Sequence, residues 1–106
     1  MSTVTVESLS LRHVLDRNRD AILEVLARYS AVNPRVFGSV ARGDATATSD
    51  LDLLVDLLPD SRSALMRVAG LGEELLDLLG VRVDVVADEL MRDEVSESAH
   101  ADSIPL

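Results

Sequence analysis

The stretch FGSVARGDATATSDLDLLVD, residues 37–56, decides the fold and the chemistry that we expect from this chain. Its first residues include the pair Gly38-Ser39, and a turn of small residues follows. Asp50 and Asp52 then stand at the start of an apolar run. Alternate side chains of a β-strand point to the same face, so Asp50 and Asp52 share a face of the strand expected at residues 51–58. Two neighbouring carboxylates repel each other, and a divalent cation relieves that repulsion. The stretch therefore predicts a metal site.

A third carboxylate, Asp84, lies in an alternating run at residues 81–87, where aspartate is disfavoured. It is either a solvent-facing residue of an edge strand or a third ligand beside Asp50 and Asp52. Three aspartates on one sheet face can hold two Mg²⁺ ions, or Mn²⁺ instead, about 3.5–4 Å apart. Asp84 would also accept the proton of an attacking hydroxyl. This arrangement is typical of phosphoryl or nucleotidyl transfer.

The Gly-Ser pair adds candidate phosphate-binding groups. Gly38 lets the backbone approach a ligand closely, and Ser39 can donate to phosphate oxygens. Arg42 would neutralise a terminal phosphate. The ordinary alternatives are a strand-to-helix turn and a solvated surface arginine. Asp56 lies on the same strand face as the first two aspartates, further along, and we interpret it as structural or close to the substrate.

Helical periodicity extends from about Leu9 to Tyr29, with a break at Asn18 as an option. Ser8 or Ser10 would cap this region and Asn33-Pro34 would end it, while residues 1–7 are interpreted as a frayed end rather than an edge strand. The further expected elements are a strand at 35–37, a brief helix at 39–42, a helix from the Ser61 or Ser63 cap to Gly80, a strand at 81–87 and a helix at 88–97. Residues 101–106 are not assigned.

Helices beside a few short strands predict an α+β fold, a small mixed β-sheet flanked by helices. The length of 106 residues predicts that residues 1–106 form a single domain.

Acidic residues outnumber basic ones by 19 to 10, which gives a net charge of −9 and argues against general nucleic-acid binding. The absence of cysteine excludes disulfides and zinc–thiolate sites. No apolar run is long enough for a membrane span, and no signal peptide is recognisable, so a cytoplasmic location is expected. His13 and His100 are interpreted as surface residues.

Gly38-Ser39, ten residues and then Asp50-Leu51-Asp52 together resemble the signature of the DNA polymerase β-like nucleotidyltransferase superfamily. Within it, GSVARGDATATSDLDLLVD is similar to the minimal nucleotidyltransferases, the antitoxin partners of HEPN toxins. The run VRVDVVAD with Asp84 and the ending SIPL also suit that group, so the resemblance covers the chain from about Ser8 onward.

The resemblance implies a sheet like the polymerase palm and the transfer of AMP from Mg²⁺-ATP to a hydroxyl. The acceptor would be a tyrosine of a cognate HEPN ribonuclease, which the modification inactivates. Asp50, Asp52 and Asp84 would be the catalytic and metal-binding residues. Gly38, Ser39 and Arg42 would bind the nucleotide.

Two alternatives stay open. The protein could neutralise a toxin by binding alone, or it could transfer a nucleotide to a small molecule or an RNA end. The apolar faces of the first and last expected helices also predict self-association or toxin docking.

Overall fold

The computed structural model describes residues 4–90 and 103–106. In chain order its elements are α1 (Val6–Arg17), α2 (Arg19–Arg28), β1 (Ala31–Phe37), α3 (Gly38–Arg42), β2 (Leu51–Leu57), α4 (Ala64–Leu79), β3 (Val83–Ala87), the 3₁₀ turn η1 (Asp88–Leu90) and β4 (Ile104–Pro105). The strands form one sheet in the order β3-β2-β1-β4. β1 is antiparallel to β2 and to β4, whereas β2 and β3 are parallel. The predicted α+β fold with a small mixed sheet is confirmed.

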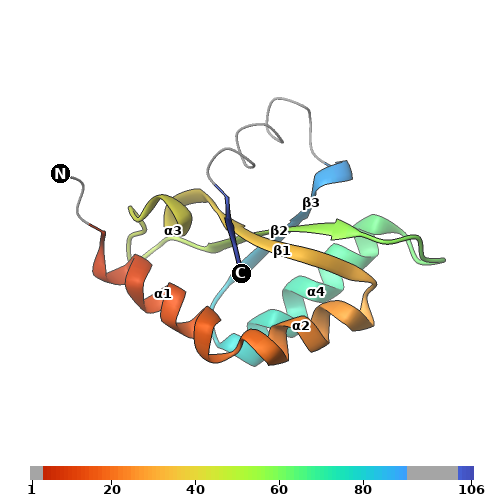
Figure 1. The fold of residues 1–106 in the computed structure, drawn as a ribbon, viewed down its shortest axis with the longest axis horizontal. Coiled ribbons are helices and arrows are strands. Elements are labelled where there is room, and N and C mark those ends of the chain that lie inside the picture. The colour runs from red at the N-terminus through yellow and green to blue at the C-terminus, as the bar shows by residue number, and fades with distance from the viewer. Residues whose placement is uncertain (1–3, 91–102) are drawn as a thin grey trace.

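The helices α1, α2 and α4 lie on one side of the sheet, and α3 lies at one end of it (Figure 1). Alternation along β2 places every second side chain under the helices, and on the other face Leu54 is also fully buried. Leu51, Leu53 and Val55 are buried in the core beneath the helices, while Asp52 and Asp56 are only partly buried. Burying one such side chain contributes about 1.5–3 kcal/mol, so the apolar half of the alternation fixes which face the aspartates share.

Helix α1 begins earlier than the sequence indicated. Thr5, not Ser8 or Ser10, is its N-cap, and the Thr5 side chain accepts a hydrogen bond from the Ser8 backbone N–H at 3.2 Å. Thr5 also donates its backbone N–H to the Gly43 carbonyl at 2.9 Å and its hydroxyl to the Ala45 carbonyl at 2.7 Å. The interpretation of residues 1–7 as a frayed end is therefore wrong from Thr5 onward, because long-range partners hold that residue.

The break at Asn18 is confirmed, since α1 ends and α2 begins there. The helical region nevertheless ends at Arg28, and Asn33-Pro34 lies inside β1 rather than before it. The pairing of β1 with β2 shifts register between Val32 and Arg35, and Asn33 has a φ of 56°. A proline, which has no N–H to donate, is tolerated at such an irregularity, so β1 is longer than predicted.

Helix α4 is bounded much as expected. Its N-cap is Ser63 rather than Ser61, and the Ser63 hydroxyl accepts from the Met66 N–H at 3.1 Å. Gly80, with a φ of 72°, ends the helix. Of the helix predicted at 88–97, the structure describes the turn η1, and the remainder lies outside the described residues.

The unassigned end of the chain contains β4, which pairs with β1. Among residues 4–90 and 103–106, no helix is long and apolar enough to cross a membrane.

Candidate active site

The strand register brings two of the three predicted aspartates together, and the third lies at the same end of the sheet. In the parallel pair of β2 and β3, Asp52 lies directly opposite Asp84. Residues opposite each other in adjacent strands share a sheet face, so Asp84 lies on the Asp52 face and not across the sheet. Asp50 precedes β2 by one residue and reaches the same end of the sheet.

The electrostatics of Asp52 report how close these carboxylates are. Burial, followed by the negative charges of Asp84 and Asp50, raises the pKa of Asp52 to about 6, against a smaller lowering effect of the Arg42 charge. In the described part of the chain, no hydrogen bond or ion pair holds the Asp52 carboxylate. The start of β2 therefore concentrates negative charge that the described residues compensate only weakly.

The carboxylates are neighbours, but they are not arranged as a finished coordination sphere. Asp50 Oδ1 lies 3.7 Å from the Arg82 Nε, and both side chains are substantially exposed, so this ion pair is weak. Across residues 4–90 and 103–106, no group of three or more His, Cys, Asp or Glu side chains is gathered closely enough to hold a metal ion. The oxygen donors suit Mg²⁺ chemically, and their use as joint ligands requires Asp50 to turn from Arg82 toward Asp52.

Gly38 is required at its position for two reasons. Its φ of 73° lies in the left-handed region, and a Cβ there would overlap the Asp52 carboxylate. Phe37 pairs with Asp52 in the β1–β2 register, which explains the close approach. The sequence indicated that a glycine here admits a ligand, and the structure shows that it admits a catalytic candidate from the neighbouring strand.

The other two predicted nucleotide-binding residues lie on α3. Arg42 forms an ion pair with Asp44, with Nε and Oδ2 at 3.4 Å, and its charge acts on Asp52. The Ser39 carbonyl accepts from the N–H groups of Gly43 and Asp44, both at 2.9 Å, which closes the helix at Gly43. The structure thus places Ser39 and Arg42 beside the aspartates, and their binding roles stay predictions.

Arg12, which the sequence analysis did not identify, holds the C-terminal end of α3 by hydrogen bonds. The Arg12 guanidinium of α1 donates to the Val40 carbonyl at 2.9 and 3.2 Å and to the Ala41 carbonyl at 3.0 Å. These carbonyls belong to the last turn of α3, where a helix leaves acceptors unpaired. Nothing in the sequence marks Arg12 among ten arginines, because its partners lie 28 and 29 residues away.

A buried serine fixes the loop that leads into β2. Ser8 is fully buried, and its hydroxyl accepts from the Ala45 N–H at 2.9 Å and lies 2.8 Å from the Thr5 hydroxyl. The N-terminus of α1 thereby anchors the segment that joins α3 to Asp50. A Ser inside a helical pattern reads as a cap, so this role was missed.

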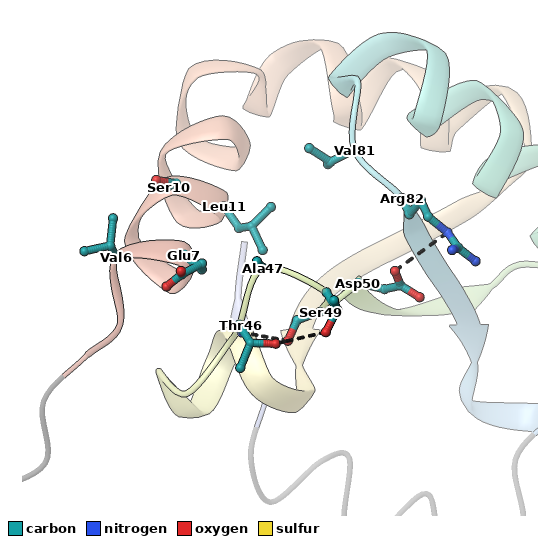
Figure 2. A pocket seen from close by; sticks show the side chains of 11 residues that line it. Val6, Glu7, Ser10, Leu11, Thr46, Ala47, Ser49, Asp50, Val81 and Arg82 are labelled. Atoms are coloured by element: carbon teal, nitrogen blue, oxygen red, sulfur yellow. Dashed lines mark hydrogen bonds and ion pairs between the residues drawn. The ribbon is translucent and has the colours of Figure 1, made fainter.

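A cavity of about 580 Å³ opens beside Asp50, between α1, the loop before β2 and the segment before β3, and neither Asp52 nor Asp84 is among its lining residues. Figure 2 shows Asp50 and Arg82 along one side of it and α1 along the other. Thr46 and Ser49 lie on the loop that borders it, where the Thr46 N–H donates to the Ser49 hydroxyl at 2.8 Å. The cavity is large enough for part of a nucleotide.

The remaining candidates have structural surroundings. Asp56 accepts from Arg35 at 2.9 Å and from the Asn33 side chain at 3.0 Å, which supports the structural interpretation of this residue. His13 is exposed, as predicted, and His100 lies outside the described residues.

Comparison with known proteins bears on this arrangement. Residues 19–104 match the family model of the nucleotidyltransferase domain. The chain is 35% identical to the protein adenylyltransferase MntA of Thermococcus cleftensis over 75 residues, which is 71% of this chain and 74% of that protein.

Solved structures agree on the fold. One, assigned as a minimal nucleotidyltransferase, superposes with a TM-score of 0.75 at 45% identity, covering 89% of this chain and 94% of that one. A toxin–antitoxin complex with AMP-PNP gives a TM-score of 0.68 at 20% identity, covering 83% and 71% respectively, and supports the fold alone. With the aspartate register, the Gly38 contact and these matches together, the chain belongs to the nucleotidyltransferase domain family, as the sequence resemblance indicated.

Proposed function

We propose that this protein is an antitoxin that transfers AMP from ATP to a hydroxyl of its partner toxin. The observation that carries the proposal is Asp52 facing Asp84 across two parallel strands, next to a glycine that leaves room for it. Support comes from the relative that is named a protein adenylyltransferase. Further support comes from the solved toxin–antitoxin structures with a similar fold, one of which contains AMP-PNP.

In the proposed reaction, the acceptor oxygen bonds to the α-phosphorus of ATP and the bond from that phosphorus to the bridging oxygen breaks. Pyrophosphate leaves with the bonding electrons, and the hydroxyl proton passes to Asp84. Ser39 and Arg42 bind the phosphates that depart. Asp50, Asp52 and Asp84 would hold two Mg²⁺ ions, or Mn²⁺, which polarise phosphate oxygens and neutralise their charge.

We further propose that the acceptor is a tyrosine of a HEPN ribonuclease. Tyrosine presents its hydroxyl on a long rigid side chain, so it can reach an active site of another protein from its own surface. The proposed modification would add a nucleotide and its negative phosphate to the ribonuclease and so inactivate it.

A second candidate function is neutralisation by binding alone. It is favoured by the contact of Asp50 with Arg82, because that contact leaves the three carboxylates apart. The two functions differ in whether the aspartates are needed for neutralisation in cells.

The deciding experiment gives the purified protein labelled ATP, Mg²⁺ and the product of the neighbouring gene. The wild-type protein should label that product, and the double variant Asp50→Asn/Asp52→Asn should not. Asp56→Asn is the matched control, since it removes a carboxylate from the same face of β2. Labelling by the double variant at the wild-type rate would overturn the proposal. Neutralisation in cells by a double variant that has lost labelling would favour binding alone.

A further inference from the structure

We propose that the groove between α4 and the outer edge of β3 is the docking surface for the acceptor protein. The occupant would be a hydroxyl-bearing segment rich in apolar and basic side chains. This inference rests on the proposed transfer of AMP to a protein, and it assigns that reaction a recognition surface that borders Asp84.

The groove follows the open edge of the described sheet. β3 is the first strand in the order β3-β2-β1-β4, so one edge of its backbone has no neighbouring strand among the described residues. Alongside it lies a hollow of about 420 Å³. Its lining residues are Leu65, Val68, Ala69, Gly72, Glu73 and Leu76 of α4 and the first three residues of β3, including Asp84. A candidate catalytic residue therefore belongs to the wall of the groove.

The groove exposes apolar surface that the fold does not need to expose. Leu65 is 70% exposed and Leu76 is 43% exposed, and both line the hollow. Gly72 lines the hollow, and a Cβ there would meet only the Val83 carbonyl at an ordinary 3.6 Å, so the packing of the fold does not require a glycine at this position. Gly70, two residues earlier, differs, since a Cβ there would collide with the ring of Tyr29. Apolar surface beside an unpaired strand edge is typical of a protein interface.

The order of groups across the sheet explains why the acceptor belongs on this side. Asp84 lies on the edge strand β3, Asp52 on β2, and α3 follows β1. In-line displacement places the attacking and leaving oxygens on opposite sides of the phosphorus. With the departing phosphates at α3, the attacking hydroxyl must arrive past the β3 edge. A protein seated in the α4–β3 groove lies beside Asp84, which is one of its lining residues.

Charge decides which kind of partner fits. The chain carries a net charge of −9, and the charged residues of the groove, Glu73 and Asp84, are both acidic. A second copy of this chain would bring the same excess of negative charge to the contact. A segment with basic side chains would instead gain from complementary charge and associate faster at low salt.

The test uses two adjacent residues of α4 that are equally exposed but differ in position. Leu65 lines the groove, and Met66, which is 73% exposed, does not. We expect Leu65→Arg to weaken the binding of the neighbouring gene's product at least tenfold, measured by calorimetry without nucleotide. Met66→Arg should change that Kd by less than twofold. Both variants should bind Mg²⁺ and a non-hydrolysable ATP analogue like the wild type, because neither residue is among the proposed metal or nucleotide ligands.

A second pair tests the charge. Glu73→Arg reverses a charge in the groove, and Asp77→Arg reverses an exposed charge elsewhere on α4. Glu73→Arg should weaken binding and flatten its salt dependence, whereas Asp77→Arg should do neither.

Equal affinities within both pairs, or no binding by the wild type, would overturn the docking surface. Loss of dimers in Leu65→Arg without loss of partner binding would assign the groove to a second copy and also overturn it. The proposed function fails differently, when the wild-type protein binds the partner and transfers no AMP.

Discussion

Strand β2 carries carboxylates at both of its ends, and the rest of the chain treats the two ends differently. At its end, Asp56 accepts from Arg35 and Asn33 of the neighbouring strand, and the Arg35 side chain is 13% exposed. At its start, Asp52 faces Asp84, and among the described residues the cation whose charge lowers the pKa of Asp52 is the exposed Arg42. Two aspartates on the same face of β2 therefore differ. Asp56 is neutralised by an ion pair with Arg35, whereas Asp52 has no ion pair among the described residues.

This difference indicates that Asp56 contributes to the stability of the fold, whereas Asp52 lowers it. An aspartate with a purely structural role can form an ion pair with an arginine on the next strand, as Asp56 does with Arg35. Keeping the start of β2 short of cations costs stability, because repulsion and burial oppose ionisation of Asp52. Such a cost is typical of a site that receives its positive charge from a ligand.

The largest expected effect is on the rate of AMP transfer, which should differ between variants at the two ends of β2. Asp52→Asn should lower AMP transfer by about 10³-fold, because it removes a group that stabilises charge at the reacting phosphate. Asp56→Asn should stay within a few-fold of the wild type. The measurement is the initial rate of labelling of the partner protein. Equal losses of transfer rate in Asp52→Asn and Asp56→Asn would contradict this prediction, because both ends of β2 would then take part in the reaction.

The next effect concerns the glycine that makes room at the start of β2. Gly38 and Gly80 have almost the same positive φ, 73° and 72°, but nothing lies within 4 Å of a Cβ at Gly80. Each alanine variant should lose about 1–2 kcal/mol of stability for the left-handed backbone. Gly38→Ala should in addition lower the rate of transfer by about 100-fold by displacing the Asp52 carboxylate. If Gly80→Ala loses as much activity, the Asp52 contact has no specific role.

The smallest effect is on stability as pH changes. The folded-state pKa of Asp52 is about 6, above its ordinary value of 3.8, so its contribution to stability is fully present below pH 3.8 and is lost as pH rises through 6. Two pKa units correspond to about 3 kcal/mol, and solvent screening of this partly exposed group reduces that to about 1 kcal/mol. Without metal, Asp52→Asn should therefore be more stable than the wild type at pH 7 and equal to it near pH 4.

Asp56→Asn should show the opposite behaviour at neutral pH. The variant loses the ion pair with the largely buried Arg35, so it should be less stable than the wild type by about 1 kcal/mol. Thermal unfolding curves of both variants at several pH values provide the measurement. A destabilised Asp52→Asn at pH 7 would contradict the account of uncompensated charge.

How much of this could be predicted from the sequence depended on the range of the interactions. Strand alternation was enough to place Asp52 and Asp56 on one face of β2, and Gly80 marked the end of α4. The exact pairing of Asp52 with Asp84 required the register of two strands that α4 separates in the chain. No local pattern encodes that register, although the mid-strand position of Asp84 was a usable signal.

The errors in the fold come from local rules that distant contacts override. Proline was expected to precede a strand, but pairing of β1 with β2 on both sides of Pro34 absorbs it as an irregularity. Thr5 appeared to be part of a loose end, and its partners Gly43 and Ala45 lie about forty residues away. The contact between Gly38 and Asp52 was hidden for the same reason, because it depends on the β1–β2 register.

The central claim is that the start of β2 is a cation and nucleotide site and the end is not. The most direct test counts Mn²⁺ bound in the presence of a non-hydrolysable ATP analogue, by electron paramagnetic resonance, for the wild type, Asp52→Asn and Asp56→Asn. We predict tight Mn²⁺ binding by the wild type and by Asp56→Asn, and its loss in Asp52→Asn. Mn²⁺ binding by Asp52→Asn equal to that of the wild type would contradict the claim.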